Sequence, residues 1–120
     1  MTYIFIAITI LCTVAGQLML KHATNNIGEM PTNIHDSVLF FFKALTNLYV
    51  IAGFALAFVA SLTWIGAVSK LELSFAYPFM SLNFVLVLLL SWPLFHEQIS
   101  PARAFGVAAI CIGVYFISRS

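Results

Sequence analysis

Long apolar segments dominate this chain and decide what it can fold into. Four of them, Thr2–Leu20, Leu48–Ser69, Ser74–Phe95 and Ala102–Ile117, are candidates for membrane-crossing helices, which need about 20 mostly apolar residues. Because 62% of the 120 residues are hydrophobic and 8% are charged, the chain is too apolar to cover a water-soluble domain. The sequence therefore predicts an all-α membrane protein: one domain, residues 1–120, built as a bundle of four transmembrane helices.

The remaining composition excludes several other classes of protein. A net charge of +1 provides no basic surface for nucleic acid. Cys12 and Cys111 both fall inside predicted spans, which argues against a disulfide framework or a Cys/His metal site. No lysine or arginine precedes the first segment and three further spans follow it, so we expect a retained helix rather than a signal peptide. The sequence has no phosphate-binding loop for ATP, and we expect no cofactor, no metal and no enzymatic activity.

The first span carries a polar stripe. Thr13, Gln17 and Lys21 recur at i, i+4 and i+8, which places them on one face of a helix. Polar side chains within a membrane usually face the bundle interior or a wet cavity, because lipid offers them no partner. Gln17 alone could simply bond a neighbouring helix while Lys21 extends to the interface. The complete stripe favours a substrate-facing role.

A turn-rich loop at 23–36 follows, and then a short segment at 36–45 that is too short to span. We expect this segment to be an interfacial helix with its phenylalanines in the acyl boundary of the membrane. An aromatic ligand site is the alternative for Phe40–Phe42.

The third span combines a proline with polar residues. Pro78 predicts a kink about one turn into the helix, because proline removes a backbone hydrogen bond. Tyr77 and Ser81 share one face and Asn83 lies near it, and an amide cannot be left bare in lipid. Kinked, polar-lined helices are typical of transporter sites. The alternative is a kink that only fits the neighbouring helices.

The end of the chain carries two structural signals. Ser100 followed by Pro101 predicts a helix start, and Glu97 is expected to accept hydrogen bonds at that positive helix end. In the last span, Gly106, Ala109 and Gly113 form one seam of small residues, which we interpret as an oligomer contact. The positive charges divide two against three between the sides of the membrane, so they favour neither orientation and allow an antiparallel pair.

Several of these motifs resemble a known family. The runs AYPFMSLNFV at 76–85 and HEQISP at 96–101, with AGQ at 15–17 and Lys21, are similar to the small subunits of 4-amino-4-deoxy-L-arabinose-phosphoundecaprenol flippases. The chain more distantly resembles the small multidrug resistance family, and both families belong to the drug/metabolite transporter superfamily. Thr13, however, stands where multidrug members carry a membrane-embedded glutamate, and the interiors of the predicted spans contain no Asp or Glu. Proton-coupled export of a cation would lack its titratable group.

The resemblance implies an anionic lipid substrate in the bacterial inner membrane. The lipid phosphate would stay near Lys21 or Arg103, while the polyprenyl tail remains among the membrane lipids. The sugar would contact the polar residues of the first and third spans, namely Thr13, Gln17, Tyr77, Ser81 and Asn83. Transport would run down the lipid's own gradient or borrow another.

Four helices scarcely enclose a path for a sugar-phosphate head, so we expect a homodimer or a heterodimer with a paralogous subunit. Two other functions stay open at this point. One is a multidrug-type exporter of a cation or neutral metabolite. The other is a non-transporting subunit of a larger complex, held through the Gly106–Gly113 face.

Overall fold

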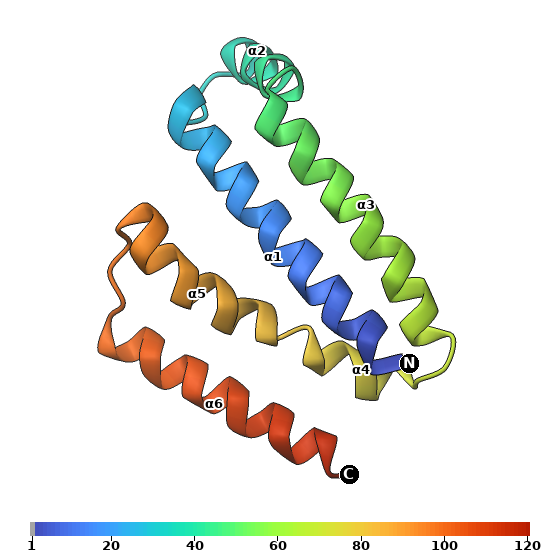
Figure 1. The fold of residues 1–120 in the computed structure, drawn as a ribbon. Coiled ribbons are helices and arrows are strands. Elements are labelled where there is room, and N and C mark those ends of the chain that lie inside the picture. Colours follow the sequence, from blue (N-terminus) through green and yellow to red (C-terminus); the bar gives the residue numbers. More distant parts are fainter. Residues whose placement is uncertain (1) are drawn as a thin grey trace.

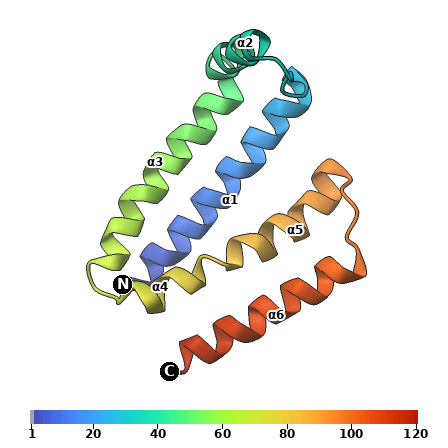
Figure 2. The same ribbon diagram turned by 180° about the vertical axis from the view of Figure 1, so that it is seen from behind.

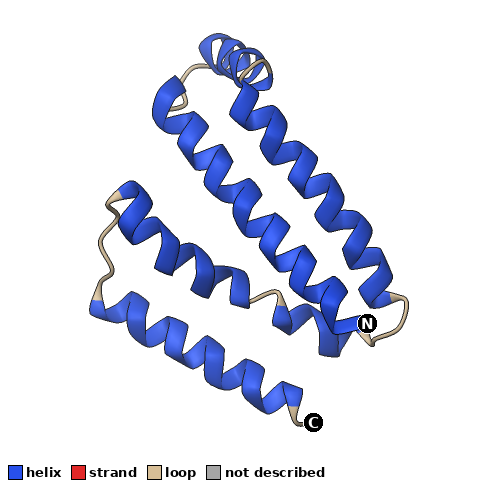
Figure 3. Ribbon diagram, in the orientation of Figure 1, coloured by secondary structure: helices blue, strands red, loops and turns tan. Residues whose placement is uncertain are grey.

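The computed structural model describes residues 2–120 and folds them into helices joined by short loops (Figures 1 and 3). In chain order the helices are α1 (Thr2–Ile27), α2 (Ile34–Leu45), α3 (Leu48–Val68), α4 (Leu73–Phe79), α5 (Leu82–Phe95) and α6 (Pro101–Ser118). Within residues 2–120, four helical stretches are long and apolar enough to cross a membrane: α1, α3, the α4–α5 pair and α6. The predicted all-α architecture with four spans is therefore confirmed.

The spans alternate in direction along the chain. The two termini lie at one end of the molecule, while the α1–α2 and α5–α6 connections lie at the opposite end (Figures 1 and 2). Helix α1 is central, since it packs along α3 on one side and against α5 on the other. Helix α6 packs against α4 and α5. We call the end that holds the α1–α2 and α5–α6 connections the loop end.

Two glycines allow α1 and α3 to cross closely. A Cβ atom on Gly16 would lie 3.1 Å from the carbonyl oxygen of Gly53, and a Cβ on Gly53 would lie 3.1 Å from that of Gly16. Towards the termini, the Thr9 and Thr63 hydroxyl oxygens join the same two helices with a 2.6 Å hydrogen bond. Small residues and interhelical hydroxyl bonds are the usual contacts between helices in lipid, where no hydrophobic force draws helices together.

The core lies beside this crossing, where α1 meets both α3 and α4. Ile6, Ile10 and Val14 recur at i, i+4 and i+8 on one face of α1 and pack with Ala67 of α3 and Ala76 of α4. The two alanines are fully buried, so their small side chains allow the short α4 to lie close to α1 and α3. This packing fixes the start of the third span against α1.

The first helix is longer than predicted. It continues past Leu20 to Ile27 and takes up part of the expected loop. It ends at Gly28, whose φ of +108° is a left-handed conformation that glycine adopts without steric cost, and whose N–H donates to the Thr24 carbonyl at 2.8 Å. Helix α2 likewise begins slightly earlier than predicted, because the Asn33 side chain caps it by accepting a bond from the Asp36 N–H.

The third span is broken rather than merely kinked. Helix α4 ends at Phe79, directly after Pro78, and α5 begins at Leu82. Across the break the backbone bonds are of the tighter i to i−3 type, including Met80 N–H to the Tyr77 carbonyl at 2.9 Å and Ser81 N–H to the Pro78 carbonyl at 3.0 Å. The missing N–H of Pro78 removes the regular bond to the Ser74 carbonyl, so the proline weakens α4 one turn before the break rather than at the break itself.

The start of α6 confirms one prediction and corrects another. Ser100 caps the helix by accepting the Arg103 N–H at 3.1 Å, and Pro101 is the first helical residue, as predicted. The expected hydrogen bonds of the Glu97 carboxylate to this helix end do not occur among residues 2–120. The Ser100 hydroxyl and carbonyl take that place, while the Glu97 backbone N–H contacts the Ser91 carbonyl at 3.4 Å after a left-handed turn at His96.

Every residue of α6 is at least partly exposed in the single chain. Cβ atoms added to Gly106 and Gly113 would meet no atom of the other described helices within 4 Å. The seam of small residues is therefore accessible to another helix, and its use as an oligomer contact stays a prediction.

Candidate substrate cavity

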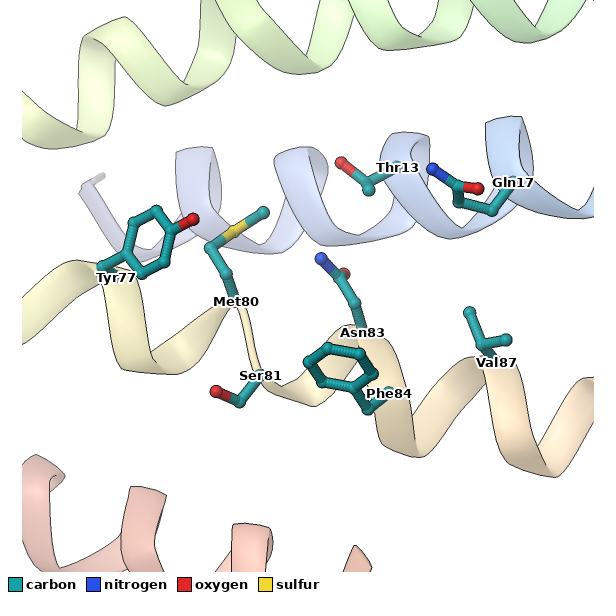
Figure 4. Close-up of a pocket in the computed structure, with 8 residues that line it drawn as sticks. All are labelled: Thr13, Gln17, Tyr77, Met80, Ser81, Asn83, Phe84 and Val87. Atoms are coloured by element: carbon teal, nitrogen blue, oxygen red, sulfur yellow. The ribbon is translucent and has the colours of Figure 1, made fainter.

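A cavity of about 440 Å³ lies between α1 and the broken third span (Figure 4). Its lining consists of Thr13 and Gln17 from α1, Tyr77 from α4, Met80 and Ser81 from the break, and Asn83, Phe84 and Val87 from α5. Five of the seven side chains that the sequence suggested for substrate binding thus surround one space. Among the described residues, no charged side chain lines this cavity.

The α1 wall of the cavity is polar because of the i, i+4 stripe. Thr13 and Gln17 lie one turn apart and both face the cavity, and Gln17 is exposed. The neighbouring Gly16 holds α1 close to α3 at the helix crossing. The close contact with α3 therefore fixes the rotation of α1 at the point where its two polar side chains meet the cavity.

The opposite wall depends on the break after Pro78. Tyr77 stands at the end of α4, with its ring 5.9 Å from that of Trp64 in an edge-to-face arrangement. Beyond the break, Asn83 reaches from α5 toward α1, whereas Ser81 points away from α1 in the same view (Figure 4). The break thus allows a phenol and an amide, separated by less than two regular turns, to line one cavity from two short helices.

Asn83 is the most unusual residue of this wall. Its Oδ1 atom is buried and has no hydrogen-bond partner among the described residues. An unpaired amide oxygen away from water costs about 1–3 kcal/mol, and buried polar groups in folded proteins are nearly always paired. The amide can exchange the positions of its oxygen and nitrogen by rotating about its last side-chain bond, which is a broad two-fold torsion. Either end can therefore be presented to a molecule in the cavity.

A second hollow of about 270 Å³ adjoins the first. The two share Thr13, Gln17 and Met80, so the space continues across the face of α1. On the α3 side its lining is small, with Gly53, Ala57, Ala60 and Ser61. The combined space is an open groove that runs from α3 to α5.

Lys21 and Arg103 lie outside the cavity. Lys21 is exposed one turn beyond Gln17 and lines a separate hollow at the loop end, together with Thr24, Asn25 and Glu29. The Arg103 guanidinium donates to the Gln98 carbonyl at 3.0 Å and is exposed at the start of α6. Lys21 lies near the end of α1 and Arg103 near the start of α6, both towards the loop end, and neither lines the cavity.

The prediction from the sequence missed three lining residues, Met80, Phe84 and Val87. They recur at i, i+4 and i+7, which is the spacing of neighbours on one helical face. That spacing could have identified them, but apolar residues in an apolar span carry no further signal. Within residues 2–120, there is no group of three or more His, Cys, Asp or Glu side chains that could hold a metal ion.

Comparisons with known proteins agree with this architecture. The model of the EamA-like transporter family matches residues 1–119. A protein of Serratia proteamaculans named "Probable 4-amino-4-deoxy-L-arabinose-phosphoundecaprenol flippase subunit ArnE" is 34% identical over 116 residues, which are 97% of this chain and 94% of that protein. The protein of the same name from Pectobacterium atrosepticum is also 34% identical, over 98% of this chain and 97% of its own length.

A subunit with a different name is similar as well. The ArnF subunit of Aeromonas hydrophila is 31% identical over 96% of this chain and 78% of its own length. No solved structure gives a significant match. Together, the four spans and the matches to bacterial transport proteins identify a multi-pass protein of the bacterial inner membrane. The chain belongs to the EamA-like transporter family.

Proposed function

We propose that this chain is a flippase subunit that translocates an undecaprenyl-phosphate-linked monosaccharide, an aminosugar such as 4-amino-4-deoxy-L-arabinose, for modification of lipid A or the cell envelope. It acts without catalysing a chemical reaction and together with a second four-helix subunit. The names of the related proteins supply the substrate class. The observation in this chain that carries the proposal is the neutral, amide-lined cavity within the membrane-spanning part.

The chemistry of the cavity suits a sugar. Its polar groups are the hydroxyls of Thr13, Tyr77 and Ser81 and the amides of Gln17 and Asn83, which donate and accept hydrogen bonds as sugar hydroxyls do. Its volume of about 440 Å³ is within the range of small-molecule sites. A lipid headgroup that crosses hydrocarbon without partners loses several kcal/mol for each polar group. A groove that offers such partners lowers this barrier.

Asn83 supports the proposal most strongly. Its unpaired amide oxygen needs a donor, and the sugar can supply one from a hydroxyl or from an amino group. Gln17 faces the same space from α1, so a headgroup between the two amides would bond to both helices. The cavity contains no carboxylate to pair with a quaternary cation. The amide oxygens of Gln17 and Asn83 can instead accept hydrogen bonds from a sugar hydroxyl or from a protonated amino group.

The lipid phosphate is best placed outside the cavity, at Lys21. Four residues of α-helix separate Lys21 from Gln17, which corresponds to about 6 Å along the helix axis. A monosaccharide that contacts Gln17 could therefore extend its phosphate to the Lys21 ammonium group at the loop end. Arg103 is a second cation at this end, although its guanidinium already binds a carbonyl of its own loop.

The second subunit completes the enclosure. The groove between α3 and α5 is open in the single chain, and α6 exposes the Gly106–Gly113 seam. Close packing of another helix on this seam would cover an unpaired face of α6. The partner is a second copy of this chain or a paralogue, and related proteins carry two subunit names.

Reconstitution into liposomes tests this proposal. The chain and its partner subunit would be supplied with the aminosugar lipid, and a membrane-impermeant amine reagent would count the headgroups on the outer leaflet over time. We expect Gln17→Leu and Asn83→Leu each to abolish most translocation, because a leucine keeps the side chain's size and removes its hydrogen bonds.

Asn26→Leu is the matched control, since Asn26 is an exposed amide of α1 beyond the cavity. Normal folding of all three variants would be checked by circular dichroism. Unchanged translocation in both Gln17→Leu and Asn83→Leu would contradict the assignment of the cavity.

A further inference from the structure

Helix α2 carries an apolar stripe that the single chain leaves about half exposed or more. Ile34, Val38, Phe41 and Leu45 recur at i, i+4, i+7 and i+11, which places them on one face of the helix. Their exposed fractions are 84%, 47%, 50% and 53%, and Phe42 beside them is 64% exposed. A stripe of this size over three turns needs a partner, since soluble surfaces rarely leave such residues together in water.

The opposite face of α2 is charged. Asp36 and Lys43 are seven residues apart and both exposed, so they share the face that points away from the stripe. The start of the helix is held in place by Asn33, which accepts the Asp36 N–H at 2.7 Å and donates to the Asp36 carboxylate at 2.9 Å. The Ser37 hydroxyl adds a 2.9 Å bond to the Pro31 carbonyl. These bonds fix where α2 begins and which residues its two faces present.

The position of α2 suggests what covers the stripe. It lies across the loop end of α1 and α3 (Figures 1 and 2), and only Thr46 and Asn47 separate it from α3. Leu48, the first residue of α3, is 76% exposed. The apolar stripe is thus tethered to the point where the apolar, outward-facing surface of a membrane span begins.

We propose that α2 is a membrane-surface helix that lies along the boundary between lipid headgroups and acyl chains. The stripe from Ile34 to Leu45 is immersed in lipid, and the face with Asp36 and Lys43 contacts water and headgroups. The lipid surface is favoured over a protein partner because both ends of α2 are joined to spans and the stripe continues into the exposed start of α3. Opposed apolar and charged faces are typical of helices that lie in this layer.

This placement has a consequence for Lys21. Phe40 of α2 and Lys21 of α1 line the same hollow at the loop end, beside Thr24 and Asn25. A lipid-immersed α2 therefore holds this hollow at the level of the headgroups, where lipid phosphates lie. The inference itself does not depend on which lipid the protein carries.

Spin labels on the full chain test the placement. In a Cys12→Ala, Cys111→Ala background, one cysteine would be introduced by Phe41→Cys or Val38→Cys on the stripe, or by Lys43→Cys as the matched control. The labelled protein would be reconstituted in vesicles of phosphatidylethanolamine and phosphatidylglycerol. Relaxation by oxygen, which concentrates in lipid, would be compared with relaxation by a water-soluble nickel chelate.

We expect oxygen to relax the Phe41 and Val38 labels several-fold more than the nickel chelate does, and the order to be reversed for Lys43. Two results would overturn the proposal. Stronger relaxation by nickel at both stripe positions would place α2 in water. Protection of the stripe labels from both reagents would show that protein, such as the second subunit, covers it instead of lipid.

Discussion

The crossing of α1 and α3 at Gly16 and Gly53 allows a quantitative test. A methyl group at Gly16 would lie 3.1 Å from the Gly53 carbonyl oxygen and 3.6 Å from Leu56 Cβ. The oxygen belongs to a helical backbone and cannot rotate away, so the helices must separate by a few tenths of an ångström. Overpacking of this kind destabilises a protein by about 1–3 kcal/mol. The higher helix propensity of alanine offsets this loss by up to about 1 kcal/mol. We expect Gly16→Ala to lower the free energy of unfolding by about 1 kcal/mol or more.

Gly66→Ala is the matched control for this prediction. The nearest atoms that a Cβ on Gly66 would meet belong to the Phe5 ring, at 3.5 Å, which is an ordinary contact. Unfolding in mixed micelles with increasing SDS, followed by circular dichroism, would measure both variants. We expect Gly66→Ala to be neutral or slightly stabilising. Equal stability of the two variants would refute the close crossing, and with it the reason why α1 presents Thr13 and Gln17 to the cavity.

Three further predictions concern single side chains. Thr9→Val should lower the free energy of unfolding by about 0.6 kcal/mol, because it removes the hydroxyl bond to Thr63. The same SDS titration in mixed micelles would measure this change. An unchanged free energy of unfolding would show that this bond is not formed. Asn83→Asp should create binding of a quaternary ammonium ion that weakens on acidification, because it adds the carboxylate that the cavity lacks. Calorimetry would measure this binding. Equal binding by the wild type would contradict the conclusion that the cavity is neutral. Lys21→Ala should weaken retention of undecaprenyl phosphate more at low salt than at high salt, because salt screens exposed charges. Lys70→Ala is the control and should leave retention unchanged, because Lys70 lies in the α3–α4 connection, away from the loop end.

Hydropathy was sufficient to predict the spans. The four apolar segments are helical in the structure apart from the break at Met80 and Ser81 in the third, since in lipid the backbone must satisfy its own hydrogen bonds. The start at Ser100 and Pro101 was also predictable, because the capping serine and the proline act within one turn. The end of α1 could not be predicted from the sequence. Its last residues carry no helix breaker before Gly28, and their polarity alone suggested a loop.

The candidate site was predictable only in part, for a related reason. The i, i+4 spacing places Thr13 and Gln17 on one face, and Pro78 indicates a distortion of the third span. Neither pattern shows which helix faces which. That depends on the close α1–α3 crossing and on the buried alanines that hold α4, contacts between residues distant in sequence. The same lack of information explains why Met80, Phe84 and Val87 were missed. It also explains why Lys21, although on the stripe, lies beyond the cavity.

Native mass spectrometry of the purified protein can show whether the cavity recognises the sugar of the lipid. Undecaprenyl phosphate and its aminoarabinose derivative would be added in turn, with a quaternary cation as competitor. We expect the protein to retain the aminosugar lipid more strongly than undecaprenyl phosphate, without displacement by the cation. We expect Asn83→Leu to abolish the preference for the sugar. Displacement of the lipid by the cation, or an unchanged preference in Asn83→Leu, would contradict a neutral sugar-binding cavity.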